Sequence, residues 1–301
     1  MSETASLPLR HLLLALAVVA IWGSNFVVIK YALHVMPPMT LAVLRFAIAF
    51  MPACFFLPRP AVGWRNLAAY GGFVAVGQFG LLYLAMRSEI SPGLASLVVQ
   101  TQVFFTLLLA VRLAGERVLA SQWLGLGLAV AGIGIIVTHT DGTTTPLGLA
   151  MVLGAAFSWA CGNIVGKRAG RVNMLAYVVW SSAFAVPPLL ALALLLDGPA
   201  RIAGALVAAD AGTWAAVLWQ AVANTLFGYG CWSWLLARHP AARIVPMALL
   251  VPIFGMGASS LLLAETLPGW KLMAAALVMA GLAINLFGPR LLRLNARPAK
   301  D

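Results

Sequence analysis

The chain is a succession of long apolar stretches, and this feature restricts its fold more than any other. A transmembrane helix needs about 20 mostly apolar residues to cross the hydrocarbon core of a bilayer. Ten such stretches occur, at 10–34, 39–57, 66–86, 93–113, 121–138, 147–167, 173–196, 212–237, 241–264 and 269–289. Turn-forming or charged residues separate them, as at Asp197-Gly198-Pro199. The sequence therefore predicts an all-α integral membrane protein with ten transmembrane helices.

The composition excludes most other classes of protein. Charged residues make up 9% of the chain, against roughly 25% in soluble domains. The net charge of +11 is spread between apolar runs, whereas nucleic-acid-binding proteins carry a clustered basic patch. The three cysteines lie in apolar segments without a CxxC motif, so we expect no disulfide, no metal site and no cofactor.

Two segments of the chain, 12–30 and 149–167, have similar sequences. Trp22 and Lys30 in the first match Trp159 and Lys167 in the second at the same separation along the chain. A second correspondence relates 116–132 to 265–281, where a glutamate and a glycine recur. The sequence thus predicts two halves, 1–140 and 141–301. The reuse of the first apolar segment also indicates a retained helix rather than a cleaved signal peptide.

The distribution of Lys and Arg predicts the orientation of the halves. Most basic residues between the spans fall on the side that carries both ends of the chain, which by the positive-inside rule places both termini in the cytoplasm. Five helices per half is an odd number, so the second half must be inverted relative to the first. Two inverted five-helix repeats with a site between them are typical of transporters.

Uncharged polar and aromatic side chains inside the spans are the candidates for a substrate pathway. Amides in lipid must find partners, so they should face the interior of the bundle, either lining a cavity or hydrogen-bonding between helices. Trp22 and Trp159 lie about 18 Å into their helices at about 1.5 Å per residue, which is near the midplane of the membrane. There they could either line the cavity or pack in the core of the bundle. The candidate substrate-binding residues are Trp22, Asn25, Lys30, Gln78, Tyr83, Gln100, Trp159, Asn163, Asn224 and Tyr229.

Lys30 and Arg45 are the cations placed well inside spans. They could reach toward the headgroups and nearby carbonyl groups, or attract a substrate carboxylate in the outer half of the pathway. Glu116 and Glu265 end the fourth and ninth helices. We interpret them as structural residues of the turns that follow.

No acidic residue falls in the middle of a predicted span, because all eight Asp and Glu residues lie at span ends or in loops. A proton-driven pump usually needs an ionisable group inside the membrane. The sequence therefore favours a facilitator or a weakly coupled carrier. A permanently cationic solute would find no counter-charge, so a zwitterionic or neutral substrate fits better.

Several segments together carry a resemblance to a known family. They are IWGSNFVVIK at 21–30, Leu44-Arg45-Phe46, LLYLAMRSEISPGLASLV at 81–98, LAGER at 113–117 and LAET at 263–266. In this order and spacing the chain resembles the EamA family of the drug/metabolite transporter superfamily, most closely the YddG-type amino-acid exporters. The resemblance implies ten helices in two inverted halves around a central pathway, and export of amino acids and related metabolites.

From these features we expect a multi-pass inner-membrane transporter, not an enzyme. It would export amino acids, aromatic and other neutral ones above all, by alternating access. Ten helices can enclose a pathway without a second copy, so we expect a monomer in the lipid bilayer. The alternatives are an exporter of drugs or phosphorylated sugars, a proton-coupled antiporter, and a channel.

Overall fold

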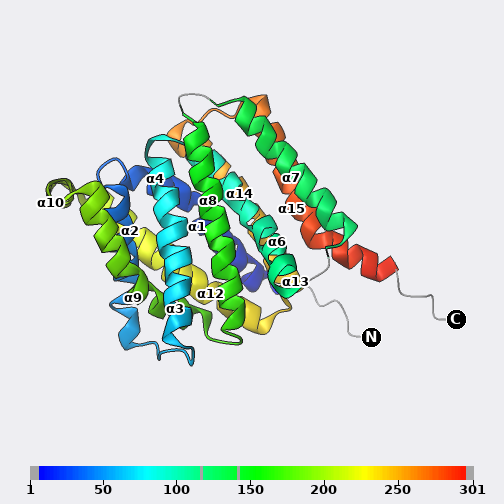
Figure 1. The fold of residues 1–301 in the computed structure, drawn as a ribbon, viewed down its shortest axis with the longest axis horizontal. Coiled ribbons are helices and arrows are strands. Elements are labelled where there is room, and N and C mark those ends of the chain that lie inside the picture. Colours follow the sequence, from blue (N-terminus) through cyan, green and yellow to red (C-terminus); the bar gives the residue numbers. More distant parts are fainter. Residues whose placement is uncertain (1–6, 116–117, 141–142, 296–301) are drawn as a thin grey trace.

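The computed structural model describes residues 7–115, 118–140 and 143–295, and the regular elements in this range are helices. Nine of these helices are long and apolar enough to cross a membrane, and the number is ten when one sharply bent pair counts as a span. This confirms the expected all-α membrane protein. The helices run side by side as a bundle, with the beginning of α1 and the end of α15 at the same end (Figure 1). We call this the terminal end, and the opposite one the far end.

The first half contains five spans. They are α1 (Leu9–Ala32); α2 (Pro38–Phe50) with the short η1 (Ala53–Phe55); α3 (Trp64–Tyr70), η2 (Gly71–Phe79) and α4 (Gly80–Ser88); α5 (Pro92–Val98), η3 (Val99–Thr101) and α6 (Gln102–Ala114); and α7 (Ala120–Thr138). Prolines 38 and 92 stand in the first turns of α2 and α5, where the missing N–H group costs no helical hydrogen bond.

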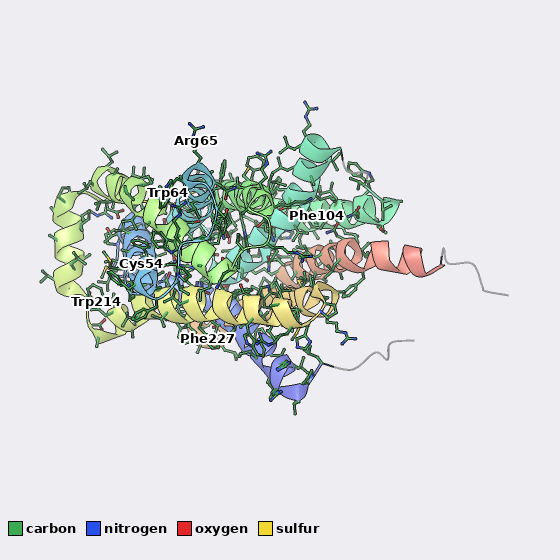
Figure 2. The ribbon with its side chains drawn as sticks, turned by 90° about the horizontal axis from the view of Figure 1, so that it is seen from below. Cys54, Trp64, Arg65, Phe104, Trp214 and Phe227 are labelled. Atoms are coloured by element: carbon green, nitrogen blue, oxygen red, sulfur yellow. The ribbon has the colours of Figure 1, made fainter. Side chains whose placement is uncertain are left out.

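The second half follows the same plan. Its elements are α8 (Pro146–Arg168); α9 (Met174–Leu192) and η4 (Ala193–Asp197); α10 (Pro199–Ala208); α11 (Ala211–Leu218), η5 (Trp219–Phe227) and α12 (Gly228–Arg238); α13 (Ala241–Ile244), η6 (Val245–Leu249) and α14 (Leu250–Leu263); and α15 (Gly269–Asn295). The helix α10 occupies a segment that the sequence pattern left as a connection. It makes an angle of 107° with the span that follows and lies across the far end of the bundle, beside Trp214 (Figure 2).

The third and fourth spans of both halves depart from regular α-helical geometry at corresponding places. The third spans contain π-helical segments, η2 and η5, and both end in a phenylalanine followed by glycine, at Phe79 and Phe227. The fourth spans contain 3₁₀ segments, η3 and η6. A π segment winds the helix more loosely and a 3₁₀ segment winds it more tightly, and both often mark functional sites. The two halves thus share local irregularities as well as span order.

The fifth helices of the two halves, α7 and α15, pair with each other at one edge of the bundle (Figure 1). Their backbones nearly touch, since a Cβ atom at Gly125 would lie 2.6 Å from the carbonyl oxygen of Gly281. Small residues permit such close packing in lipid. The remaining eight spans are therefore left to surround the centre of the molecule.

The first helix of one half packs against the fourth span of the other. A Cβ atom at Gly23 of α1 would lie 2.6 Å from the carbonyl oxygen of Val251, and one at Gly255 would lie 2.4 Å from Ser96 Oγ. These glycines bring α1, α14 and α5 together across the boundary between the halves. The close contact seals this side of the bundle around its centre.

Corresponding helix ends in the two halves differ in a way that predicts a stability effect. Gly115 after α6 and Ala264 after α14 both adopt left-handed backbone conformations, with φ of 64° and 52°. This conformation costs an L-residue about 1–2 kcal/mol. We expect Ala264→Gly to raise the free energy of unfolding by about 1 kcal/mol. The measurement is a higher melting temperature in detergent.

The reverse change is the matched control. Gly115→Ala should lower the melting temperature by a similar amount, because a Cβ atom there meets nothing within 4 Å and only the backbone conformation is affected. A lower melting temperature for Ala264→Gly would contradict this account of the two helix ends.

Candidate transport site

A cavity of about 990 Å³ lies at the centre of the bundle. Its wall is formed by the first, third and fourth spans of both halves, together with Met174 at the start of α9. Gly170, Arg171 and Val172 belong to the wall and lie in the connection between α8 and α9. Six spans separate this connection from the start of the chain, so it lies at the terminal end. The cavity therefore reaches the terminal end of the bundle.

One face of α1 contributes Trp22, Asn25, Phe26 and Ile29 to the wall. Their spacing of three and four residues places them on the same side of the helix. The indole Nε1 of Trp22 donates a hydrogen bond of 3.1 Å to the carbonyl oxygen of Asn224 in η5. This bond joins α1 of the first half to the π-helical segment of the second half.

An aromatic cluster continues the wall from Trp22 onto α12. The Trp22 ring lies 5.7 Å from the ring of Tyr229 and 5.1 Å from that of Trp232, measured between centroids. Rings at such distances attract one another. The cluster offers an apolar surface on which a substrate side chain can pack.

On the opposite wall, α8 contributes Trp159 and Asn163. The Nδ2 atom of Asn163 donates to Gln102 Oε1 at 2.8 Å and to Thr106 Oγ1 at 3.1 Å, both on α6. The side chain therefore both lines the cavity and connects helices from the two halves. The sequence left two roles open for an amide inside a span, lining a cavity or hydrogen-bonding between helices, and Asn163 has both.

Two amide oxygens in the wall have no hydrogen-bond partner among the described residues. They are Asn25 Oδ1 and Gln78 Oε1, and both side chains are buried. Buried polar atoms in proteins are nearly always hydrogen-bonded. Both oxygens are shielded from the open space of the cavity in this conformation, so a solute would bond them only after a local side-chain rotation.

Eight of the ten candidate residues lie on this cavity. They are Trp22, Asn25, Gln78, Gln100, Trp159, Asn163, Asn224 and Tyr229. The wall also contains residues that the sequence argument did not include among the candidates, notably Phe26, Tyr70, Phe79, Gln102 and Trp232. Helical spacing from the candidates in the wall points to some of them, because Phe26 is four residues after Trp22 and Tyr70 is eight before Gln78.

The other two candidates, Lys30 and Tyr83, are not part of the cavity wall. Lys30 Nζ donates to the carbonyl oxygens of Met86 at 3.0 Å and Arg87 at 2.9 Å, at the end of α4. A lysine in this position satisfies carbonyl groups that the last turn of a helix leaves free. Tyr83 is fully buried, and its hydroxyl accepts a hydrogen bond from Arg45 and donates one to Gln220.

Charge is nearly absent from the cavity. Among the described residues, Arg171 at the terminal end is the one charged side chain in the wall, and no acidic residue belongs to it. The acids that the structure describes, Glu89, Asp197, Asp210 and Glu265, follow or precede spans at the far end. Glu3, Glu116, Asp141 and Asp301 lie outside the described residues.

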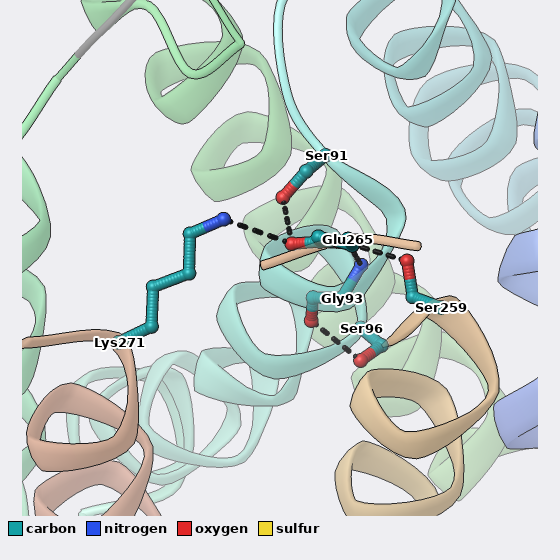
Figure 3. Close-up of polar contacts among 6 residues, drawn as sticks. All are labelled: Ser91, Gly93, Ser96, Ser259, Glu265 and Lys271. Carbon is teal, nitrogen blue, oxygen red and sulfur yellow. Dashed lines mark hydrogen bonds and ion pairs between the residues drawn. The ribbon is translucent and has the colours of Figure 1, made fainter. Parts of the chain in front are cut away.

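Glu265 joins the two halves at the far end (Figure 3). Its carboxylate accepts hydrogen bonds from Ser91 and from the backbone N–H group of Gly93 in the first half, and from Ser259 in its own half. Lys271 Nζ forms an ion pair with it at 3.0 Å. A carboxylate at the first turn of a helix satisfies free N–H groups and interacts favourably with the helix dipole. We call these five residues the far-end network.

Two further acids make contacts between the halves at the same end. Asp197 Oδ2 accepts hydrogen bonds from the backbone N–H of Thr40 at 2.7 Å and from its hydroxyl at 2.8 Å, in the first turn of α2. Glu89 accepts one from Thr145 Oγ1 at 2.6 Å, at the start of α8. Asp197 thus caps a helix of the first half, and Glu89 bonds the residue whose own hydroxyl caps α8 of the second half. The far end is thus held together across the boundary between the halves.

The charge of Glu265 persists at neutral pH. Burial by itself would raise the pKa of Glu265, but hydrogen bonds from Ser259, Ser91 and Gly93 together with Lys271 outweigh burial and hold the pKa below its ordinary value. A lowered pKa stabilises the closed arrangement above the ordinary pKa of a glutamate, and this stabilisation is lost as the pH falls through the lowered value. The far-end network should therefore not titrate between about pH 6 and 8.

Neutralising Glu265 should open the far end. In a variant with Cys54, Cys161 and Cys231 replaced by serine and Leu82→Cys in the cavity wall, we expect Glu265→Gln to raise the rate of maleimide labelling from the far side about tenfold, as lost charge-assisted hydrogen bonds shift the closed–open equilibrium. The assay uses a membrane-impermeant maleimide on sealed vesicles.

Asp210→Asn is the matched control, because Asp210 caps only its own helix through Thr213. It should leave the labelling rate unchanged. Equal maleimide labelling rates in Glu265→Gln and Asp210→Asn would show that the far-end network does not keep the far end closed.

Comparison with known proteins agrees with this geometry. The EamA-like transporter family matches residues 9–138 and again residues 146–287. A probable amino-acid metabolite efflux pump of Salmonella typhimurium is 43% identical over 93% of this chain and 96% of its own length. A protein of the same description from Escherichia coli (strain K12) is 42% identical over 92% and 95%.

More distant proteins extend the same comparison. A probable terminal-alkyne amino-acid exporter of Streptantibioticus cattleyicolor is 25% identical over 88% of this chain and 90% of its own. One solved crystal structure, at 19% identity, has a TM-score of 0.63 over 96% of this chain and 99% of that chain, and shares the fold. Together the two matched segments cover most of the sequence, and the chain belongs to the EamA-like transporter family of membrane transporters.

Proposed function

We propose that this protein exports amino acids and related small metabolites across the inner membrane, with aromatic and other neutral amino acids as preferred substrates. The observation that carries the proposal is the central cavity, which is lined by amides and aromatic rings without a described acidic residue. The descriptions of the relatives as amino-acid efflux pumps and exporters support the same substrate class.

The chemistry of the wall suits a zwitterion. A cavity of about 990 Å³ is at the upper end of the range for small-molecule sites, about 300–1,000 Å³. The unpartnered oxygens of Asn25 and Gln78 would accept hydrogen bonds from an amino group once a side-chain rotation turns them into the cavity, and the Trp22 cluster can pack against a side chain. A phosphorylated sugar would need several cations, and the described wall offers Arg171 alone.

Export would proceed by alternating access between halves at about 1–140 and 141–301. The cavity reaches the terminal end, while acids cap helices across the halves at the far end. With both termini cytoplasmic, this conformation admits substrate from the cytoplasm. The corresponding irregular segments of the third and fourth spans would let the halves exchange roles in the opposite conformation.

Transport should not require a proton gradient. We expect the purified protein in proteoliposomes to catalyse saturable counterflow of phenylalanine and leucine at the same rate with and without a pH difference across the membrane. The physical reason is that no described acid lines the cavity. If counterflow ceases when the gradient is removed, the protein is a proton-coupled antiporter instead.

The cavity should set substrate affinity through its aromatic residues. We expect Trp159→Ala to raise the phenylalanine concentration for half-maximal counterflow about tenfold, which corresponds to about 1.4 kcal/mol of lost contact. Trp123→Ala is the control, because Trp123 is exposed on α7 away from the cavity. Equal kinetics in the two variants would exclude Trp159 from the site.

A further inference from the structure

Arg45 in α2 is a buried cation without an anionic partner among the described residues. The side chain is 1% exposed. One terminal nitrogen donates to the Tyr83 hydroxyl at 2.9 Å and the other to Thr225 Oγ1 at 3.2 Å. The Nε atom is buried and has no hydrogen-bond partner. Both bonded groups are neutral, so the positive charge of Arg45 remains uncompensated.

The described acids are committed elsewhere. Asp197 and Glu265 cap helices of the other half at the far end, Glu89 accepts from the Thr145 hydroxyl, and Asp210 caps its own helix. An arginine keeps its proton in proteins, and a buried charge without a counter-charge is costly. The helix α2 does not need a charged side chain at position 45 to be stable. The charge of Arg45 therefore indicates a function of its own.

A single aromatic ring separates this charge from the transport cavity. The guanidinium carbon of Arg45 lies 3.9 Å from the centroid of the Phe79 ring, and Phe79 belongs to the cavity wall. Thr225, which Arg45 bonds, directly follows the wall residue Asn224 in η5. Charge acts over longer distances in a low-dielectric interior than in water. The cavity is therefore exposed to a fixed positive field on its Phe79 side.

We propose that Arg45 is the specificity-determining residue of the transport site and that its charge selects solutes with a free carboxylate group. This inference rests on the proposed function and names the substrate group that the site recognises. The carboxylate supplies the missing counter-charge when the solute enters. Removing the charge from Arg45 removes the preference.

The amino group of the solute, unlike its carboxylate, does not need to be charged. No described acid in the wall can pair with an ammonium group. Once turned into the cavity, the unpartnered oxygens of Asn25 and Gln78 would accept a hydrogen bond from an ammonium or from a neutral amide N–H alike. The site should therefore demand a carboxylate and tolerate an acylated amino group.

The test uses three forms of one amino acid in proteoliposome counterflow. Phenylalanine is the labelled solute, and unlabelled phenylalaninamide and N-acetylphenylalanine are the competitors. The amide lacks the carboxylate and the acetyl derivative lacks the ammonium group. We expect N-acetylphenylalanine to compete about as well as phenylalanine, and phenylalaninamide to compete at least about tenfold less well.

The variants connect this preference to Arg45. In Arg45→Gln and in the apolar Arg45→Met, phenylalaninamide should compete as well as phenylalanine, whereas Arg45→Lys should retain the preference for the carboxylate. Arg171→Gln, which removes the cation from the wall at the terminal end, should retain it as well. A preference retained in Arg45→Gln or Arg45→Met would overturn the proposal.

The wild-type protein alone also decides the matter if the charge-free variants do not fold. Equal competition by the amide and by phenylalanine in the wild type would overturn the role of Arg45 while leaving amino-acid export intact. If neither phenylalanine nor leucine undergoes counterflow at all, the proposed function fails instead.

Discussion

The absence of water from the hydrocarbon core is the constraint on which the rest of the structure depends. Each backbone N–H and C=O group in a span must find a partner within the protein. Departures from α-helical geometry are tolerated only where the protein itself or a cavity receives the freed groups. The π segments η2 and η5 and the 3₁₀ segments η3 and η6 obey this rule, since each contributes to the wall of the central cavity. The irregular segments of the third and fourth spans thus coincide with the candidate transport site, whereas η1 and η4 lie outside the cavity wall.

The same constraint explains where the acids are. A carboxylate inside a span would need a partner, whereas one at a span end can satisfy the free N–H groups that begin another helix. Glu265 and Asp197 use this possibility, and each caps a helix of the other half, while Glu89 bonds the hydroxyl of Thr145, the residue that caps α8. The acids therefore hold the halves together at one end without adding negative charge to the pathway.

Much of this arrangement is readable from the sequence, because lipid imposes simple rules on a chain. Apolar length located the spans to within a few residues: the stretch expected at 66–86 is the helical span Trp64–Ser88. The need of an in-span amide for a partner correctly placed Asn25, Gln78 and Asn163 toward the interior. The helix α10 was missed because it does not cross the membrane, and so apolar length carries no signal for it.

These rules do not predict which side chains form hydrogen bonds with residues that are distant in the sequence. Lys30 and Tyr83 have the same character as the wall residues, and only the packed structure shows that carbonyl groups of α4 and the Arg45 guanidinium already engage them. Glu265 was expected to belong to its own turn. Its bonds to Ser91 and Gly93 depend on how the second half sits against the first, which no local pattern records.

The distribution of charge between the two ends also has a consequence for the resting conformation. In the described part of the chain, charge-assisted caps between the halves occur at the far end, while the terminal end has contacts such as the one between His11 and His239 at 2.7 Å. Hydrogen bonds to charged groups contribute more than those between neutral groups. These charge-assisted hydrogen bonds therefore stabilise the closed far end. With both termini cytoplasmic, as proposed, the cavity of this conformation would open to the compartment from which an exporter must collect its solute.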